Sequence, residues 1–277
     1  MKTTPDKRIV IFAALLIFGL ISGLGLRFLA RQLSRSSPPP KYEVILTIPE
    51  GFSISEIERR LREAGIASAQ KLPDLTIKDF KNSSGTSSYD FLDDAPADAS
   101  LEGFLFPDTY RFWPDSPAEA VVKKFLDNFG KKLAPAWRAE IERQNKKIYD
   151  VVIMASLVEK EVKSDKDRAM VSGILWKRLG AGMKLDVDYT ICYIKARQGK
   201  DCAPITADDK KIDSPYNTYI YKGLPPAPVS NPGEAALKAA IFPEANPYWY
   251  YLSAPDGKTI FSRTLDEHNA AIRKYLR

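Results

Sequence analysis

Two spacings of apolar residues follow each other along this chain, and their alternation predicts a mixed α+β fold. Residues 42–51, YEVILTIPEG, are rich in β-branched side chains and alternate enough to form a strand. Apolar residues then recur every three to four positions, which predicts a helix that stops at Gly65. Ser53 and Glu56 form a capping box at the start of this helix. The result is a strand-helix unit too small to be stable alone.

Helical spacing dominates the middle of the chain. Helices are expected at about 117–130, 135–145, 149–163 and 165–179. At 248–262 two apolar runs flank the turn sequence PDGK, which predicts a β-hairpin. Thr264 and Glu267 form a second capping box, so a final amphipathic helix is expected after the hairpin.

Two segments carry weaker signals. Residues 67–100 are rich in Ser, Asp, Ala and Lys with little periodicity, and are expected to form a helix and loops. Residues 101–117, LEGFLFPDTYRFWPDSP, contain five aromatic residues, three prolines and three acidic residues. This composition predicts an ordered, partly exposed surface instead of a plain core element.

An uncharged apolar stretch near the N-terminus predicts a membrane anchor. Residues 9–26 contain no charge and no proline over 18 positions, which is the lower length for crossing a bilayer. A cleaved signal peptide is the alternative, but the stretch continues into further arginines without a small-x-small cleavage site. We expect an uncleaved transmembrane anchor over 9–29 behind a cytoplasmic tail, 1–8. A serine and proline linker, 30–41, would then lift the body off the membrane.

Composition and charge limit the classes of function. With 277 residues, 44% of them hydrophobic, the chain is long enough for one sizeable core or two modest domains and too apolar to be disordered. The formal net charge of +6 suits an anionic surface or polymer. Acidic and basic residues are interspersed, and no basic cluster is interleaved with aromatics, so a nucleic-acid partner is not expected.

The two cysteines leave alternatives open. Cys192 and Cys202 are separated by nine residues, so in an exported domain they can close a small loop that stabilises the fold by roughly 3 kcal/mol. Two inert thiols are the alternative. A metal site is disfavoured because one close cysteine pair and a single histidine supply too few ligands. We expect neither a metal nor a cofactor.

The segment 151–162, VVIMASLVEKEV, places two glutamates after an almost wholly apolar helix. On a helical wheel Glu159 and Glu161 both fall among apolar positions, but they point in different directions. Burial disfavours the charged form of a carboxyl group, and a carboxyl kept protonated near neutral pH can act as a general acid. The alternative is a solvated helix end whose glutamates pair with Lys160 or Lys163.

An aromatic and amide-rich segment offers a second candidate site. Residues 213–240 place tyrosines, an asparagine and a threonine before a rigid proline loop, and Asn231 with Pro232 leads into a further helix. Flat aromatic faces stack on sugar rings, and amide groups bond to N-acetyl and hydroxyl groups. The alternative is a tyrosine-rich structural turn.

Six stretches together resemble one family, the membrane-anchored endolytic murein transglycosylases (MltG, or YceG-like). They are TIPEG at 47–51, LEGFLFPDTY at 101–110, ASLVEKE at 155–161, SPYNTY at 214–219, GLPPAPVSNPGEAALKAA at 223–240 and EHN at 267–269. The order is that of the family. The resemblance implies a lytic transglycosylase that cleaves the MurNAc-GlcNAc bond of peptidoglycan without water and leaves 1,6-anhydroMurNAc ends.

The resemblance also implies which residues carry the chemistry. The first glutamate of VEKE maps onto Glu159, which would be the catalytic acid and base. The motif LDVDYT at 185–190 stands where relatives tend to read LQTDPT, so the glutamine is replaced while the aspartate and threonine remain. The substrate-binding candidates are Glu102, Tyr110, Asp188, Thr190, Tyr216, Asn217, Thr218 and Tyr219.

The resemblance completes the domain layout. It implies a small, reduced LysM-like α/β subdomain at 42–95 and a larger α+β, YceG-like catalytic domain at 96–277. The expected location is the bacterial inner membrane, single-pass, with the catalytic domain in the periplasm. Nascent glycan strands are the expected partner, and peptidoglycan synthases are the partner class implied. Two rival functions are a catalytically inactive wall-binding scaffold and a hydrolytic muramidase that uses Asp188 or Glu102 as its second carboxylate.

Overall fold

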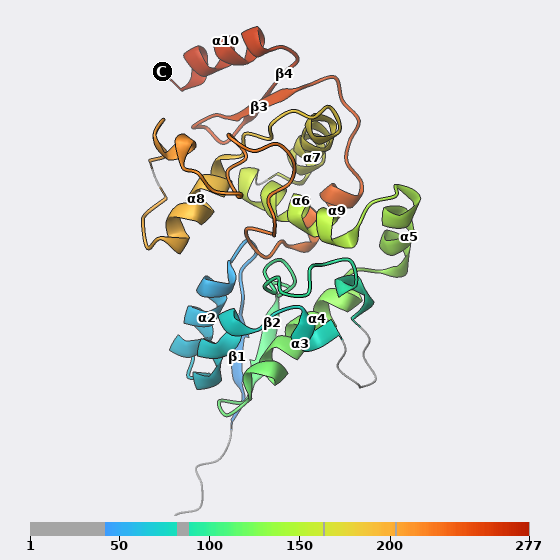
Figure 1. Ribbon diagram of the computed structural model, residues 1–277, viewed down its shortest axis with the longest axis vertical. Helices are drawn as coiled ribbons and strands as arrows, with labels where there is room; N and C mark the ends of the chain where they lie inside the picture. Colours follow the sequence, from blue (N-terminus) through green and yellow to red (C-terminus); the bar gives the residue numbers. More distant parts are fainter. Residues whose placement is uncertain (1–41, 82–88, 163, 203, 277) are drawn as a thin grey trace, which may run out of the picture. The chain divides into compact units, whose positions relative to one another are not determined.

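The computed structural model describes residues 42–81, 89–162, 164–202 and 204–276 (Figure 1). The chain from Glu43 onward forms one compact unit. In the described residues, helices combine with two small antiparallel sheets, which confirms the predicted α+β class. The predicted tail, anchor and linker lie outside the described residues. In the part that the structure describes, no helix is long and apolar enough to cross a membrane.

The first sheet joins segments that lie far apart in the sequence. Strand β1 (Val44–Thr47) pairs antiparallel with β2 (Thr109–Phe112), so that Val44 lies opposite Phe112. The sequence analysis predicts β1 but not β2. Because β2 belongs to the segment assigned to the larger domain, this pairing crosses the boundary predicted between residues 95 and 96. The division into LysM-like and catalytic domains stays a prediction.

Helix α2 (Ile54–Glu63) begins at the predicted capping box. Ser53 and Glu56 exchange both hydrogen bonds, and the buried face of the helix carries Ile54, Ile57 and Leu61. The chain then makes a 3-10 turn, a short helix and a second 3-10 turn in the region expected to hold a helix and loops. These elements are η1 (Ala67–Asp74), α3 (Lys78–Lys81) and η2 (Asp90–Leu92).

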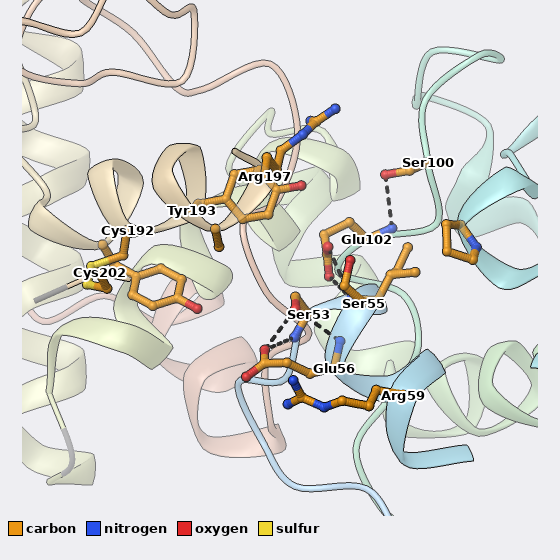
Figure 2. A pocket seen from close by; sticks show the side chains of 14 residues that line it. Ser53, Ser55, Glu56, Arg59, Ser100, Glu102, Cys192, Tyr193, Arg197 and Cys202 are labelled. Carbon is orange, nitrogen blue, oxygen red and sulfur yellow. Dashed lines mark hydrogen bonds between the residues drawn. A yellow bond between two sulfur atoms is a disulfide. The ribbon is translucent and has the colours of Figure 1, made fainter. Parts of the chain in front are cut away.

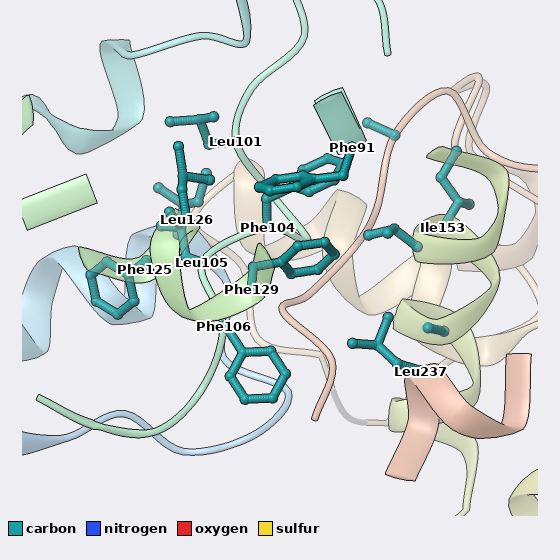
Figure 3. Close-up of a cluster of buried hydrophobic side chains, with 14 of the residues drawn as sticks. Phe91, Leu101, Phe104, Leu105, Phe106, Phe125, Leu126, Phe129, Ile153 and Leu237 are labelled. Carbon is teal, nitrogen blue, oxygen red and sulfur yellow. The ribbon is translucent and has the colours of Figure 1, made fainter. Parts of the chain in front are cut away.

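An aromatic cluster forms the centre of the core (Figure 3). Phe91 and Phe104 pack against Phe129 of α4 (Ala118–Lys132), with ring centroids 4.9 and 5.2 Å from that of Phe129. Residues 101–107 are all buried. The prediction of a partly exposed surface is therefore wrong for this half of the 101–117 segment, because its aromatic residues face the core. Exposure begins only at residue 108.

Helix α6 (Ile148–Glu161) is the most deeply buried helix of the described chain, since every residue from Tyr149 to Val158 except Asp150 is buried. Its neighbours α7 (Asp165–Gly180) and α9 (Glu234–Ile241) pack against it and against each other. Helix α5 (Pro135–Arg143) packs on both α6 and α9. The sequence predicted all four helices. This packing leaves the last turn of α6, which carries the two glutamates, partly exposed.

The C-terminal part contains one element that the sequence did not predict, α8 (Asp188–Arg197). Cys192 of this helix forms a disulfide with Cys202. A 3-10 turn, η3 (Asp209–Lys211), follows. The predicted hairpin is present as β3 (Tyr250–Ser253) and β4 (Thr259–Ser262), and the predicted final helix as α10 (Leu265–Tyr275).

Candidate active site

Glu159 lies in the last turn of α6, and only 7% of its side chain is exposed. One carboxylate oxygen accepts a hydrogen bond from Arg168 Nη2 at 3.2 Å, and the other accepts one from the Gly233 N–H at 3.0 Å. The two donors come from α7 and from the residue before α9. Three packed helices thus fix the position of one carboxyl group.

Opposing effects set the protonation of Glu159. Burial is the largest and raises the pKa of its carboxyl group above the usual value, while the Gly233 hydrogen bond and the charge of Arg168 lower it. The negative charge of Glu50 raises it further. The net direction is upward, which favours the protonated form that a general acid needs.

A glycine turn packs against the same end of α6. Gly51 has a φ of +74°, a conformation that favours glycine, and a side chain there would meet Glu159 Cγ at 3.4 Å and Lys160 Cδ at 3.3 Å. Lys160 donates a hydrogen bond to the Gly51 carbonyl at 3.1 Å, and its ammonium lies 4.2 Å from the centroid of the Tyr189 ring. The TIPEG segment is thereby held beside the glutamate.

A cavity of about 520 Å³ opens between α2 and α8 (Figure 2). Glu56 and Arg59 of α2 line one side, and Tyr193 and Arg197 of α8 line the other. Glu102 and the two cysteines of the disulfide, Cys192 and Cys202, also line the cavity. It therefore combines carboxyl, guanidinium and aromatic groups, which is a surface suited to polar sugars.

Glu102 is the most deeply buried acid of this cavity. Its carboxyl group accepts hydrogen bonds from the Ile54 N–H at 3.0 Å and from Asn231 Nδ2 at 2.8 Å. Burial raises its pKa to about 8 in spite of these two bonds. Glu102 is consequently neutral at neutral pH, and it caps the first turn of α2 from the side of the cavity.

Asn231 connects the segments around the site. Its side-chain oxygen accepts from the Gly103 and Leu105 N–H groups, both at 2.9 Å. Its amide nitrogen donates to the Phe52 carbonyl at 2.9 Å and to Glu102. Asn231 is completely buried, and both polar atoms of its side chain are fully used.

Glu161 faces a different cavity, of about 460 Å³, lined by residues of β3 and α10 and by the start of α8. Tyr251 donates a hydrogen bond to its Oε2 at 2.8 Å. Burial raises the pKa of Glu161 to about 7. The wheel prediction that the two glutamates point in different directions is thereby confirmed.

Three of the predicted substrate-binding residues line the cavities. Glu102 lies in the first, and Asp188 and Tyr219 lie in the second, where the Tyr219 hydroxyl donates to Asp188. Tyr216 is half-buried beside the first cavity, with its ring centroid 5.1 Å from that of Tyr193. Glu159 itself lines neither cavity.

The other predicted residues lie beneath the surface, where internal hydrogen bonds take up their polar atoms. The Tyr110 hydroxyl donates to the Phe106 carbonyl, and the Asn217 amide donates to the carbonyls of Lys210 and Ile212. Thr218 accepts from the Val187 N–H, and Thr190 donates to the Val187 carbonyl. Thr190, Asn217 and Thr218 shape the segments that carry Asp188 and Tyr219, and Tyr110 belongs to the core. None of the four lines either cavity.

Sequence reasoning did not find Arg168, Asn231 or the Gly233 N–H as parts of the site. Arg168 follows Glu159 by nine positions across a helix break, a spacing without any periodic signal. Asn231 looked like a turn residue before a helix. Among the described residues, no group of three His, Cys, Asp or Glu side chains is placed to hold a metal.

Comparisons with known proteins relate the chain to one family. The model of the YceG-like family matches residues 18–274. The chain is 34% identical over 176 residues to the endolytic murein transglycosylase of Bacillus subtilis, covering 64% of this chain and 48% of the relative. It is 27% identical over 280 residues to the protein of the same name from Streptococcus pneumoniae strain D39, covering 94% and 50%. The chain thus spans about half the length of these curated relatives.

A solved structure has the same fold. The crystal structure of a YceG-like protein from Listeria monocytogenes superposes with a TM-score of 0.66 and 32% sequence identity. The superposition covers 82% of this chain and 76% of that one. The similarity therefore extends beyond the motifs to most of the described fold.

Proposed function

Since this chain belongs to the YceG-like family, we propose that it is an endolytic lytic transglycosylase of peptidoglycan, a carbon-oxygen lyase. It cleaves the MurNAc-GlcNAc bond inside nascent glycan strands, leaves 1,6-anhydroMurNAc ends and so terminates glycan elongation. The observation that carries the proposal is the environment of Glu159. One carboxyl group is buried, its pKa is raised, and three helices hold it in place.

In the proposed mechanism Glu159 first acts as the acid. Its carboxyl proton passes to the glycosidic oxygen while the bond from that oxygen to C1 of MurNAc breaks, through an oxocarbenium-like transition state. The GlcNAc end leaves with the proton. The resulting carboxylate is stabilised by the Gly233 N–H and by Arg168, both of which already contact its oxygens.

Glu159 then acts as the base. The carboxylate accepts the proton of the MurNAc C6 hydroxyl while the hydroxyl oxygen forms a bond to C1, which returns Glu159 to its starting state. No water is consumed. Because the nucleophile belongs to the same sugar, its effective concentration is high and no second catalytic carboxylate is required. We assign Glu102, Asp188, Tyr216 and Tyr219 to binding of the strand on either side of the cleaved bond.

The location is part of the proposal. An anchor at residues 9–29 would hold the enzyme in the bacterial inner membrane with its catalytic part in the periplasm, close to newly made strands. The long polar body that follows the apolar stretch supports this orientation. Peptidoglycan synthases are the partner class that would supply such strands.

The test is digestion of purified glycan strands by the full chain in mild detergent, followed by mass spectrometry of the new ends. Anhydro ends, one water lighter than reducing ends, are expected. Glu159→Gln keeps the size and the hydrogen-bonding oxygen but cannot donate its proton, so cleavage should fall by roughly 100-fold or more. Glu142→Gln, an exposed exchange on α5, is the matched control and should cleave normally.

Each other outcome identifies a rival. Reducing ends would replace the transglycosylase with a hydrolytic muramidase. Binding of strands without cleavage by the wild type would favour an inactive wall-binding scaffold. Strong residual cleavage by Glu159→Gln would show that another carboxyl group is the acid.

A further inference from the structure

Helix α10 turns its apolar face toward a cavity instead of the core. Leu265, His268, Ile272 and Leu276 follow each other at spacings of three or four residues, and all of them line the cavity that contains Glu161. No residue of α10 is buried, and Leu265 remains 53% exposed. Leu265, Ile272 and Leu276 therefore give the cavity an apolar surface that is available to a ligand, whereas the ring of His268 stacks on that of Tyr250.

Charged residues line this cavity as well. Arg178 pairs with Asp186, and Lys210 pairs with Asp188 at 3.2 Å. Both aspartates thus have a cationic partner within the cavity lining. Charges of both signs in one cavity suit a ligand that itself carries both signs.

Glu161 is the exception among these residues. Among the described residues it forms no ion pair. Tyr251 donates a hydrogen bond to it at 2.8 Å, and the charges of Asp188 and Lys210 act on it in opposite directions. It is partly buried, lines the cavity and sits where the α6 helix ends, so a cation from outside would be its natural partner.

A buried donor in the same cavity lining also lacks a partner. Arg178 is 5% exposed, and its Nε has no hydrogen-bond partner among the described residues. Arg178 also lines the cavity, and a guanidinium group in a cavity wall fits a ligand carboxylate. The cavity therefore offers the Glu161 carboxylate for a ligand cation, the Arg178 guanidinium for a ligand anion and the apolar side chains of α10 for the uncharged part of a ligand.

From this juxtaposition we infer that the cavity between α6, β3 and α10 binds the peptide stem of an uncrosslinked glycan strand, with Glu161 receiving the free ammonium of the stem's diamino acid. This inference rests on the proposed function for its substrate. The alanine methyl groups and the methylene chain of the stem lie against the α10 stripe, and a stem carboxylate faces Arg178. A strand without stems carries only the lactyl carboxylate of MurNAc and no cation, so it leaves Glu161 unpaired.

A site for the free ammonium distinguishes crosslinked from uncrosslinked stems. Crosslinking converts the diamino acid's amine into an amide, which removes the positive charge that Glu161 recognises. The cavity consequently favours strands that have not yet been crosslinked. This preference would direct cleavage to newly made material without any contact to the synthases.

Binding is measured first, because it does not depend on cleavage. The full chain in mild detergent is titrated by calorimetry with a synthetic stem tripeptide, N-acetyl-L-Ala, γ-linked D-Glu and a diamino acid, in which only the second amine of the diamino acid is free. The comparison peptide is acetylated on that second amine as well. Loss of one charge-assisted contact predicts roughly tenfold weaker binding of the acetylated peptide. This comparison uses the wild-type protein and cannot fail through misfolding.

Variants then locate the contact. Glu161→Gln retains an acceptor for Tyr251 and should bind both peptides equally weakly, whereas Arg273→Gln, on an exposed position of α10 outside the cavity, should keep the tenfold difference. No peptide binding, or equal binding of both peptides by the wild type, would overturn the inference. So would binding of a stem-free glycan oligosaccharide that is lost in Glu161→Gln while the peptide does not bind.

A cleavage arm separates this inference from the proposed function. Strands with free stem amines should be cleaved with a kcat/KM roughly tenfold above that for amine-acetylated strands, and Glu161→Gln should reduce that ratio toward one. Absence of any cleavage contradicts the proposed function but leaves the calorimetric result standing. Cleavage with equal rates on both strands contradicts the stem site alone.

Discussion

Replacing Asn231 by alanine should destabilise the protein far more than removal of one surface amide. Its side chain accepts hydrogen bonds from the Gly103 and Leu105 N–H groups and donates to Phe52 and Glu102. All four partners belong to segments that surround the candidate site. Asn231→Ala removes every one of these bonds in a fully buried position.

The expected magnitude follows from the groups left behind. A buried N–H without a partner costs about 1–3 kcal/mol, and Asn231→Ala leaves two of them. The Phe52 carbonyl keeps a bond from the Asn231 main chain, so it adds little. The sum is roughly 3–5 kcal/mol, which for a unit of this size lowers Tm by about 10 °C.

The assay is urea denaturation followed by tryptophan fluorescence, with calorimetry for Tm. Asn128→Ala is the matched control, because its amide also makes two side-chain bonds, to Asp108 and to the Tyr110 hydroxyl, but it lies partly at the surface. It should cost about 1 kcal/mol or less. If the two variants lose equal stability, Asn231 does not hold the segments together in the way described.

Three further predictions concern the same region and the disulfide. The folded-state pKa of Glu102 lies at about 8, above its unfolded value, so the folded state loses stability as pH rises toward 8. The free energy of unfolding of the wild type should fall by on the order of 2–4 kcal/mol between pH 5 and pH 8, measured by urea titration, and that of Glu102→Gln should fall by less. Gly103→Ala should cost more than about 2 kcal/mol in thermal unfolding, since φ is +90° and the new Cβ would meet Pro228 at 2.6 Å; a neutral result would mean that the loop moves freely. The double exchange of Cys192 and Cys202 to alanine should lose roughly 2–3 kcal/mol, matching the reduced wild type, and a difference between the two would point to effects beyond the crosslink.

Local signals in the sequence predicted the elements that depend on short-range chemistry. Both predicted caps begin helices, at Ser53 and at Thr264, because each side chain accepts a hydrogen bond from the N–H three positions on. The Ser53 box is complete, whereas the Glu267 carboxylate accepts from the Arg263 N–H instead of the Thr264 N–H. The PDGK turn and its flanking apolar runs form the expected hairpin. Strand β2 escaped prediction because TYRF is short, lies between prolines and becomes a strand only through its distant partner β1.

Helix α8 and the burial of residues 101–107 were also not predicted, because both depend on tertiary contacts. Helix α8 is rich in β-branched and aromatic residues, which have low helix propensity, so tertiary contacts and its disulfide stabilise it. The burial of residues 101–107 could not be inferred from composition, because prolines and acids suggested a surface. Glu102 shows why this failed, since its carboxyl group is buried but accepts two internal hydrogen bonds.

The candidate site was only partly predictable. The helical wheel placed Glu159 and Glu161 among apolar positions, which agrees with their burial, and the family motifs selected the first of them. Their partners Arg168 and Gly233 could not be deduced, because each contact depends on how α7 and α9 pack on α6. Periodicity reports which face of a helix is buried but not which atoms cover it.

The long sequence distances within the site also determine when it can form. Asn231 bonds to Phe52 across 179 positions and to Glu102 across 129, and Gly233 reaches Glu159 across 74. Contacts so distant form late in folding, because the intervening chain must close first. A chain still being synthesised therefore contains the helices up to α8 before it can assemble the site, and it stays inactive until the segment around residue 233 has been made and has docked.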